Sequence, residues 1–124
     1  MTDKDRLDFA KGILQKRESL ADTKKSISNE LHSIRLNIRE AIMEEDTEVN
    51  LKKELQKEIK QEGYRKHING KIHELDATLN DVIMGTGDFN PQQLDFFDLP
   101  NVKKEYSEKE KEAKKKQAKN EEEK

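Results

Sequence analysis

An apolar residue recurs every seven positions through the first third of the chain, and this spacing constrains the fold more than any other feature. A second apolar position lies three or four residues from the first, so the two together form the narrow stripe of a coiled-coil helix. The pattern predicts one long helix over residues 4–45. Its first position holds Ile13, Leu20, Ile27, Ile34 and Ala41, and its second holds Ala10, Leu31 and Ile38.

A second apolar stripe follows an acidic turn at residues 44–50, where Asp46 or Thr47 is expected to cap the next helix. The stripe changes phase at Gly63, and we therefore predict a bend or short break there, with a weaker interruption at Asn69-Gly70. Gly85 is expected to end this helix because glycine tolerates the left-handed conformation. The apolar members are Leu51, Leu55 and Ile59 before Gly63, and Ile68, Ile72, Leu75, Leu79 and Val82 after it.

Composition favours long helices over a compact core. Charged residues make up 42% of the chain and hydrophobic residues 31%, against roughly 25% and about 45–50% in ordinary domains. We predict an all-α protein, a long helical hairpin or coiled coil over residues 1–85, and a homo-oligomer that covers the stripe. The oligomer seam is assigned to Ile13, Leu20, Ile27, Leu31, Ile34, Ile38, Ile68, Ile72, Leu75, Leu79 and Val82.

Catalytic chemistry finds little support in the sequence. The chain has no cysteine, which excludes disulfides and thiolate catalysis. His32, His67 and His73 lack the spacing of metal ligands on one helix face. We therefore expect no enzyme, metal or cofactor. The N-terminus does not resemble a secretory signal, and no run approaches the ~18 apolar residues of a membrane span, so we expect a cytoplasmic protein without membrane partners.

Three of the four phenylalanines fall within residues 89–100, FNPQQLDFFDLP. Pro91 and Pro100 disfavour helix, so residues 86–102 are expected to be extended and to form a flexible arm. Residues 103–124 form a charged tail, which is either a solvated helix or disordered. A structural role for the segment is one hypothesis, in which its apolar side chains fold back to cap the open end of the hairpin. Those side chains are Leu94, Phe96, Phe97 and Leu99.

The order Gln93-Leu94-Asp95-Phe96-Phe97 resembles the bacterial sliding-clamp-binding motif, commonly Gln-Leu-(Ser or Asp)-Leu-Phe. The resemblance implies docking into a hydrophobic pocket on the ring-shaped processivity clamp of DNA polymerase. The Gln93 amide would fix the register and Leu94 would fill a first apolar subsite. Phe96 and Phe97 would fill a deeper one, and Asp95 would face water. The hypothesis is a non-enzymatic adaptor or inhibitor in bacterial or phage DNA replication or repair.

Two alternatives involve the helical region. Residues 20–31, LADTKKSISNEL, resemble the long first helix of GapR-type nucleoid-associated proteins, which form dimers and tetramers around DNA. A coiled-coil DNA-binding protein is therefore the first alternative, although interleaved acids also suit pairs between helix neighbours. A structural coiled-coil scaffold is the second. The candidate DNA-contacting residues are Arg35, Arg39, Lys52, Lys53, Lys57, Lys60, Arg65 and Lys66.

Overall fold

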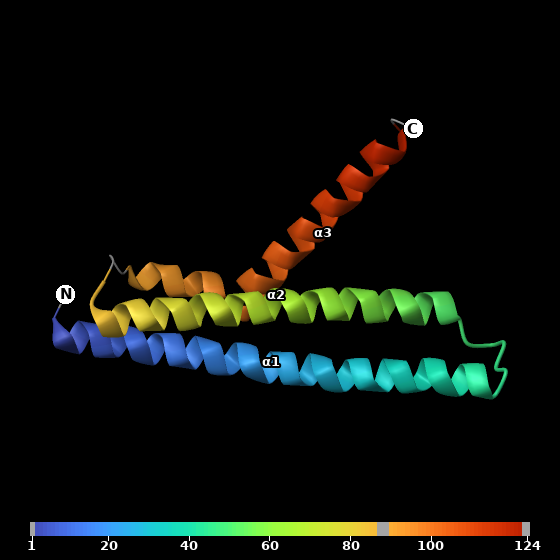
Figure 1. The fold of residues 1–124 in the computed structure, drawn as a ribbon, viewed down its shortest axis with the longest axis horizontal. Coiled ribbons are helices and arrows are strands. Elements are labelled where there is room, and N and C mark those ends of the chain that lie inside the picture. The colour runs from blue at the N-terminus through green and yellow to red at the C-terminus, as the bar shows by residue number, and fades with distance from the viewer. Residues whose placement is uncertain (1, 87–89, 123–124) are drawn as a thin grey trace.

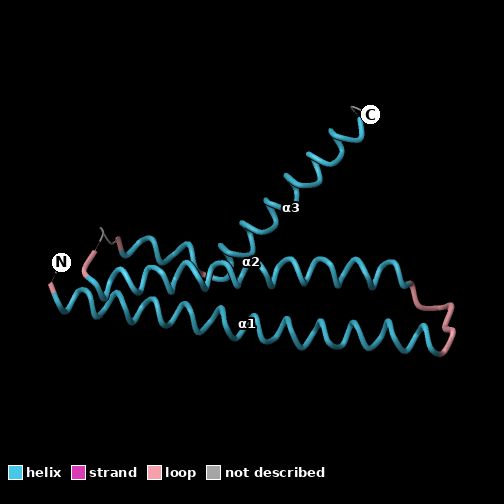
Figure 2. The backbone as a smooth tube through the Cα atoms, viewed as in Figure 1, coloured by secondary structure: helices cyan, strands magenta, loops and turns pink. Residues whose placement is uncertain are grey.

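Two long antiparallel helices form the body of the protein in the computed structural model, which describes residues 2–86 and 90–122 (Figures 1 and 2). Helix α1 spans Asp3–Met43 and helix α2 spans Leu51–Met84. A 3₁₀ helix, η1, covers Pro91–Phe97, and α3 covers Leu99–Glu122. No strand occurs in the described ranges, which confirms the all-α prediction. Nor does any helix within them have the length and apolar character needed to span a bilayer.

Helix α2 begins later than its expected cap. The side chain of Asn50 accepts a hydrogen bond from the Lys53 backbone N–H at 3.1 Å, so Asn50 is the N-cap. The predicted caps, Asp46 and Thr47, lie within the turn instead. There the Asp46 carboxylate accepts from the Glu48 N–H at 3.0 Å, which shapes the turn before the helix starts.

Helix α2 then continues without interruption, so the predicted break near Gly63 and the weaker one at Asn69-Gly70 are wrong. A glycine inside a helix costs about 1 kcal/mol relative to alanine, which lowers stability without ending the helix. A Cβ atom at Gly63 would lie 2.4 Å from the hydroxyl of Tyr106, so this glycine allows α3 to approach closely. At the other end, Gly85 has φ of 72° and ends α2 as predicted.

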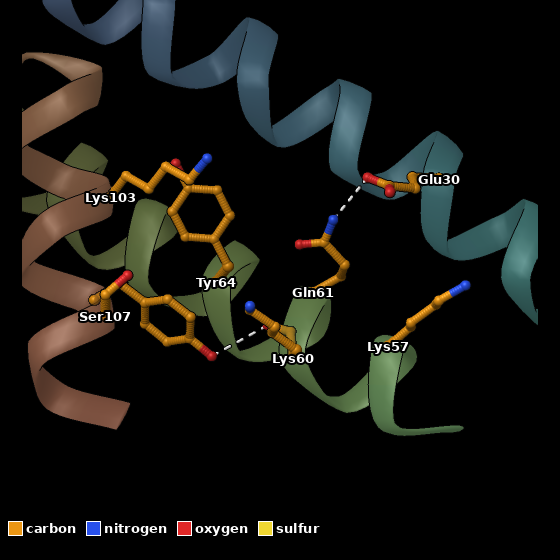
Figure 3. A pocket seen from close by; sticks show the side chains of 8 residues that line it. Glu30, Lys57, Lys60, Gln61, Tyr64, Lys103 and Ser107 are labelled. Carbon is orange, nitrogen blue, oxygen red and sulfur yellow. Dashed lines mark hydrogen bonds between the residues drawn. The ribbon is translucent and has the colours of Figure 1, made fainter. Parts of the chain in front are cut away.

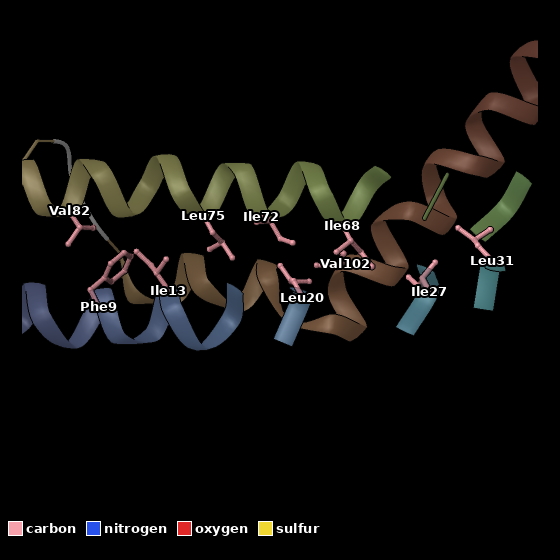
Figure 4. Close-up of a cluster of buried hydrophobic side chains, with 10 residues drawn as sticks. All are labelled: Phe9, Ile13, Leu20, Ile27, Leu31, Ile68, Ile72, Leu75, Val82 and Val102. Atoms are coloured by element: carbon pink, nitrogen blue, oxygen red, sulfur yellow. The ribbon is translucent and has the colours of Figure 1, made fainter. Parts of the chain in front are cut away.

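The two apolar stripes meet between α1 and α2 of the same chain. The side chains fill the interface between the helices in Figure 4, joined by Phe9 and by Val102 of α3. The residues assigned to an oligomer seam are therefore largely covered within one chain, and Ile38 and Leu79 are half-buried. The buried members are Ile13, Leu20, Ile27, Leu31, Ile34, Ile68, Ile72, Leu75 and Val82.

The unbroken course of α2 turns its first apolar stripe outward. Leu51, Leu55 and Ile59 are 38%, 50% and 65% exposed. The turn end of the hairpin is held by polar contacts in their place. The Arg35 guanidinium donates to the carboxylates of Glu58 and Glu62, both at 3.0 Å. These ion pairs therefore supplement the apolar packing toward the turn, which continues there through the buried Ile34 and Ala41.

Candidate partner-binding segment

The segment that carries the clamp-motif resemblance is helical, so the extended structure predicted for residues 86–102 is wrong over 91–97 and from 99 onward. Residues 87–89 of that prediction lie outside the described residues. Asn90 caps η1 by accepting from the Gln92 N–H at 3.0 Å, and Pro91 is the first helical residue. Pro100 is the second residue of α3. Both prolines thus occupy a first helical turn, where a missing N–H leaves no hydrogen bond unmade.

The 3₁₀ geometry divides the motif between the core and the solvent. Residues three apart lie on one side of such a helix, and Leu94 and Phe97 accordingly pack against the hairpin core. Gln93 and Asp95 face the solvent, and Phe96 is 66% exposed. Leu94, Phe97 and Leu99 therefore fold back onto the hairpin as proposed, although along its side and not over its open end. Phe96 does not fold back.

A notch in α1 receives Leu94. A Cβ atom on Gly12 would lie 2.7 Å from Leu94 Cδ1, so the leucine occupies the space that a side chain at Gly12 would need. Beside it, the Lys71 ammonium lies 5.7 Å from the centroid of the Phe97 ring, within range of a cation–π interaction. These two contacts fix the apolar side of η1 on both helices of the hairpin.

The junction between η1 and α3 is held by polar contacts. The Lys16 ammonium forms an ion pair with the Asp98 carboxylate. The Asn101 side-chain amide donates to the Asp95 carbonyl at 2.7 Å, and the Val102 N–H donates to the Asp98 carbonyl at 3.0 Å. The segment expected to be a free arm is therefore docked, although no residue of η1 is fully buried.

The candidate DNA-contacting residues do not form one free basic face. The Arg65 guanidinium approaches Glu62 at 3.6 Å, and Lys57 pairs with Glu54 at 3.2 Å. Together with the ion pairs of Arg35 across the hairpin, these pairs within α2 leave three of the predicted residues already paired with carboxylates. The others are exposed: Arg39, Lys52, Lys53, Lys60 and Lys66.

A polar aromatic cluster lies between α2 and α3, and the sequence patterns did not predict it. The rings of Tyr64 and Tyr106 lie 5.4 Å apart, and the His67 ring lies 5.6 Å from Tyr106. Burial lowers the pKa of His67 and outweighs the opposing effect of Glu105. The sequence does carry a signal for this docking, because Leu99, Val102 and Tyr106 are spaced by three and four, as on one helix face.

The tyrosine cluster predicts an unusual alkaline titration. Burial, followed by a hydrogen bond with Glu110, raises the pKa of Tyr106 to about 12, and burial also raises the pKa of Tyr64. The docked helix thus favours neutral phenols, so this contribution to docking is full below pH ~10 and is lost as the pH rises through about 12.

Phenolate absorbance measures this effect directly, because the chain has two tyrosines and no tryptophan. We expect one phenol to ionise near pH 12 in the native protein. In concentrated urea both should ionise near pH ~10. Two native phenols that already ionise near pH ~10 would contradict the docking of α3.

No family model, curated protein or solved structure matches the chain. Its function is accordingly inferred from its own residues and their geometry.

Proposed function

We propose that the protein is a non-enzymatic binding protein that engages the bacterial DNA sliding clamp through residues 93–97. The order Gln-Leu-Asp-Phe-Phe carries the proposal. The exposure of Gln93 and Phe96 adds support, because both are open to a partner before the segment moves. The bound protein would either occupy the pocket that a polymerase needs or use the clamp to moor its helical body at DNA.

Clamp binding in this mode requires η1 to leave the hairpin. All of the apolar motif residues must then reach one partner surface, whereas the docked segment directs Leu94 and Phe97 inward. Full burial of one such side chain contributes about 1.5–3 kcal/mol, so releasing two half-buried ones costs on the order of 2 kcal/mol. That cost lowers the apparent affinity roughly 30-fold relative to a permanently free segment. Docking would thus make the free protein a weak binder until the clamp captures the segment.

Titration of the purified chain with a bacterial sliding clamp by calorimetry tests the proposal. Phe96→Ala is the most informative variant, because this side chain is 66% exposed and its loss leaves the docked fold intact. We expect it to weaken clamp binding at least about tenfold with unchanged thermal stability. Gln93→Ala should also weaken binding, while Gln92→Ala, an equally exposed neighbour outside the motif, serves as the matched control.

Gly12→Gln tests the release step in the same titration. The new side chain would need the space of Leu94 Cδ1 and should displace that leucine from its notch, which weakens docking of the segment, while glutamine favours helix in α1. We expect clamp affinity to rise about tenfold or more. A fall in affinity would show that the docked form is the one that binds. Absence of binding by both wild type and Gly12→Gln at tens of micromolar would overturn the proposal.

A further inference from the structure

A hollow of about 420 Å³ lies between α1, α2 and the start of α3, away from the clamp-motif residues (Figure 3). Its volume is in the range of small-molecule sites. Three lysines and both tyrosines of the chain contribute to its lining. These residues are Lys57, Lys60, Lys103, Tyr64 and Tyr106.

The charge of the lining is positive. Its one carboxylate, Glu30, already accepts a hydrogen bond from the Gln61 side-chain amide at 2.8 Å. Lys57 has an ion pair with Glu54, which lies outside the lining. The described part of the chain shows no ion pair for Lys60 or Lys103. Two ammonium groups are thus available to an anion that enters the hollow.

The tyrosines supply a fixed aromatic surface beside these charges. The Tyr106 hydroxyl donates to the Lys60 carbonyl at 3.1 Å, which holds its ring against α2. The Tyr64 ring is tilted by 37° to it and stands between Lys103 and Gln61 in Figure 3. Both rings are half-buried, so each keeps part of its surface open to a ligand.

We propose that this hollow binds a nucleotide unit, with the base against the tyrosine rings and the phosphate at Lys60 and Lys103. Aromatic rings beside a basic groove are the usual means of holding single strands without sequence preference. A second hollow shares Lys60 and Tyr106 and adds Lys114, with Glu110 beside it, which lengthens the site along α3 without adding net charge. A single strand therefore fits better than a lone nucleotide. The site uses none of residues 93–97, so a test of nucleotide binding does not depend on whether the protein binds the clamp.

Fluorescence anisotropy of a short labelled oligothymidylate, titrated with the full chain over a range of salt concentrations, tests this site. The double variant Lys60→Gln/Lys103→Gln should lose at least about tenfold in affinity. Its salt dependence should also fall, by a slope of about 1.4 for two lost phosphate contacts. Lys4→Gln/Lys11→Gln removes the same charge from exposed positions on α1 outside the hollow, and should stay within about twofold of wild type.

Tyr64→Leu tests the stacking surface and should lose about tenfold in affinity. Circular dichroism checks that α3 remains folded in this variant. If α3 unfolds, the lysine variants still test the site, because they alter only exposed side chains. Equal losses in the two lysine pairs, or no binding by wild type at low salt, would overturn the site. Displacement of the label by thymidine monophosphate would identify a free nucleotide as ligand, and displacement only by unlabelled strand would identify the strand.

Discussion

Leu75→Ala is expected to lower the free energy of unfolding of the hairpin by about 3 kcal/mol. Leu75 is fully buried in the core cluster, where it packs between α2 and α1. Truncating such a leucine loses the transfer free energy of its methyl groups and leaves a cavity, and these two effects together cost about 2–5 kcal/mol. Small domains have only about 5–15 kcal/mol of stability, so the change is a large fraction of the total. Urea unfolding followed by circular dichroism measures it.

Ile59→Ala is the matched control on the same helix. Ile59 is 65% exposed because α2 runs straight through Gly63. Its truncation should change the free energy of unfolding by less than about 0.5 kcal/mol. A bend at Gly63 would instead turn Ile59 toward α1, and the two variants would then lose similar amounts. Comparable losses would therefore contradict the unbroken helix.

The helix positions and much of the core follow from the heptad pattern. The spacing of Ile13, Leu20 and Ile27 predicts their shared face, and the structure buries all three. The pattern does not specify what covers that face of α1. A second copy of the chain and the chain's own α2 each offer an apolar stripe that could pack against it. The structure shows the intrachain solution for these residues.

The phase change at Gly63 illustrates why periodicity alone was insufficient. A shift of the apolar stripe has two physical solutions: the helix bends to keep the stripe inside, or it continues and exposes the stripe. The second requires other contacts to hold the helices together. Arg35 supplies them by reaching Glu58 and Glu62 across the interface, and pairings of this kind depend on distant residues that local patterns do not identify.

The docked segment was mispredicted for a related reason. A proline that opens a helix and a proline that prevents one look alike in a sequence, and Pro91 opens η1. The spacing of Leu94 and Phe97 was available, but the notch at Gly12 that receives Leu94 belongs to a different helix. Composition also concealed the docking of α3, because Val102 and Tyr106 stand in an otherwise charged stretch.

Val102→Asp is expected to detach α3 and η1 from the hairpin while α1 and α2 remain paired. Val102 is fully buried, and it is the α3 residue within the core cluster, grouped with Leu20 and Ile68 in Figure 4. Burying an unpaired carboxylate at this position would cost several kcal/mol, which exceeds the stabilisation that the partly buried docking contacts around it contribute. The hairpin should persist because α1 and α2 supply the other buried members of the cluster.

Tyrosine titration and clamp binding together report the detachment. The pKa of Tyr106 should fall from about 12 toward the ordinary phenol value, because the burial that raises it is lost. Clamp affinity should rise about tenfold or more if the freed segment is the binding form. Lys115→Gln makes the same change in charge at an exposed position farther along α3 and should change neither property. Detachment without a gain in clamp affinity would separate the two ideas: Val102 would still anchor α3, but docking of η1 would not restrain clamp binding. An unchanged Tyr106 pKa would instead show that a buried valine does not hold α3, and would place the anchor at the Lys16–Asp98 ion pair and the Tyr106 hydrogen bond.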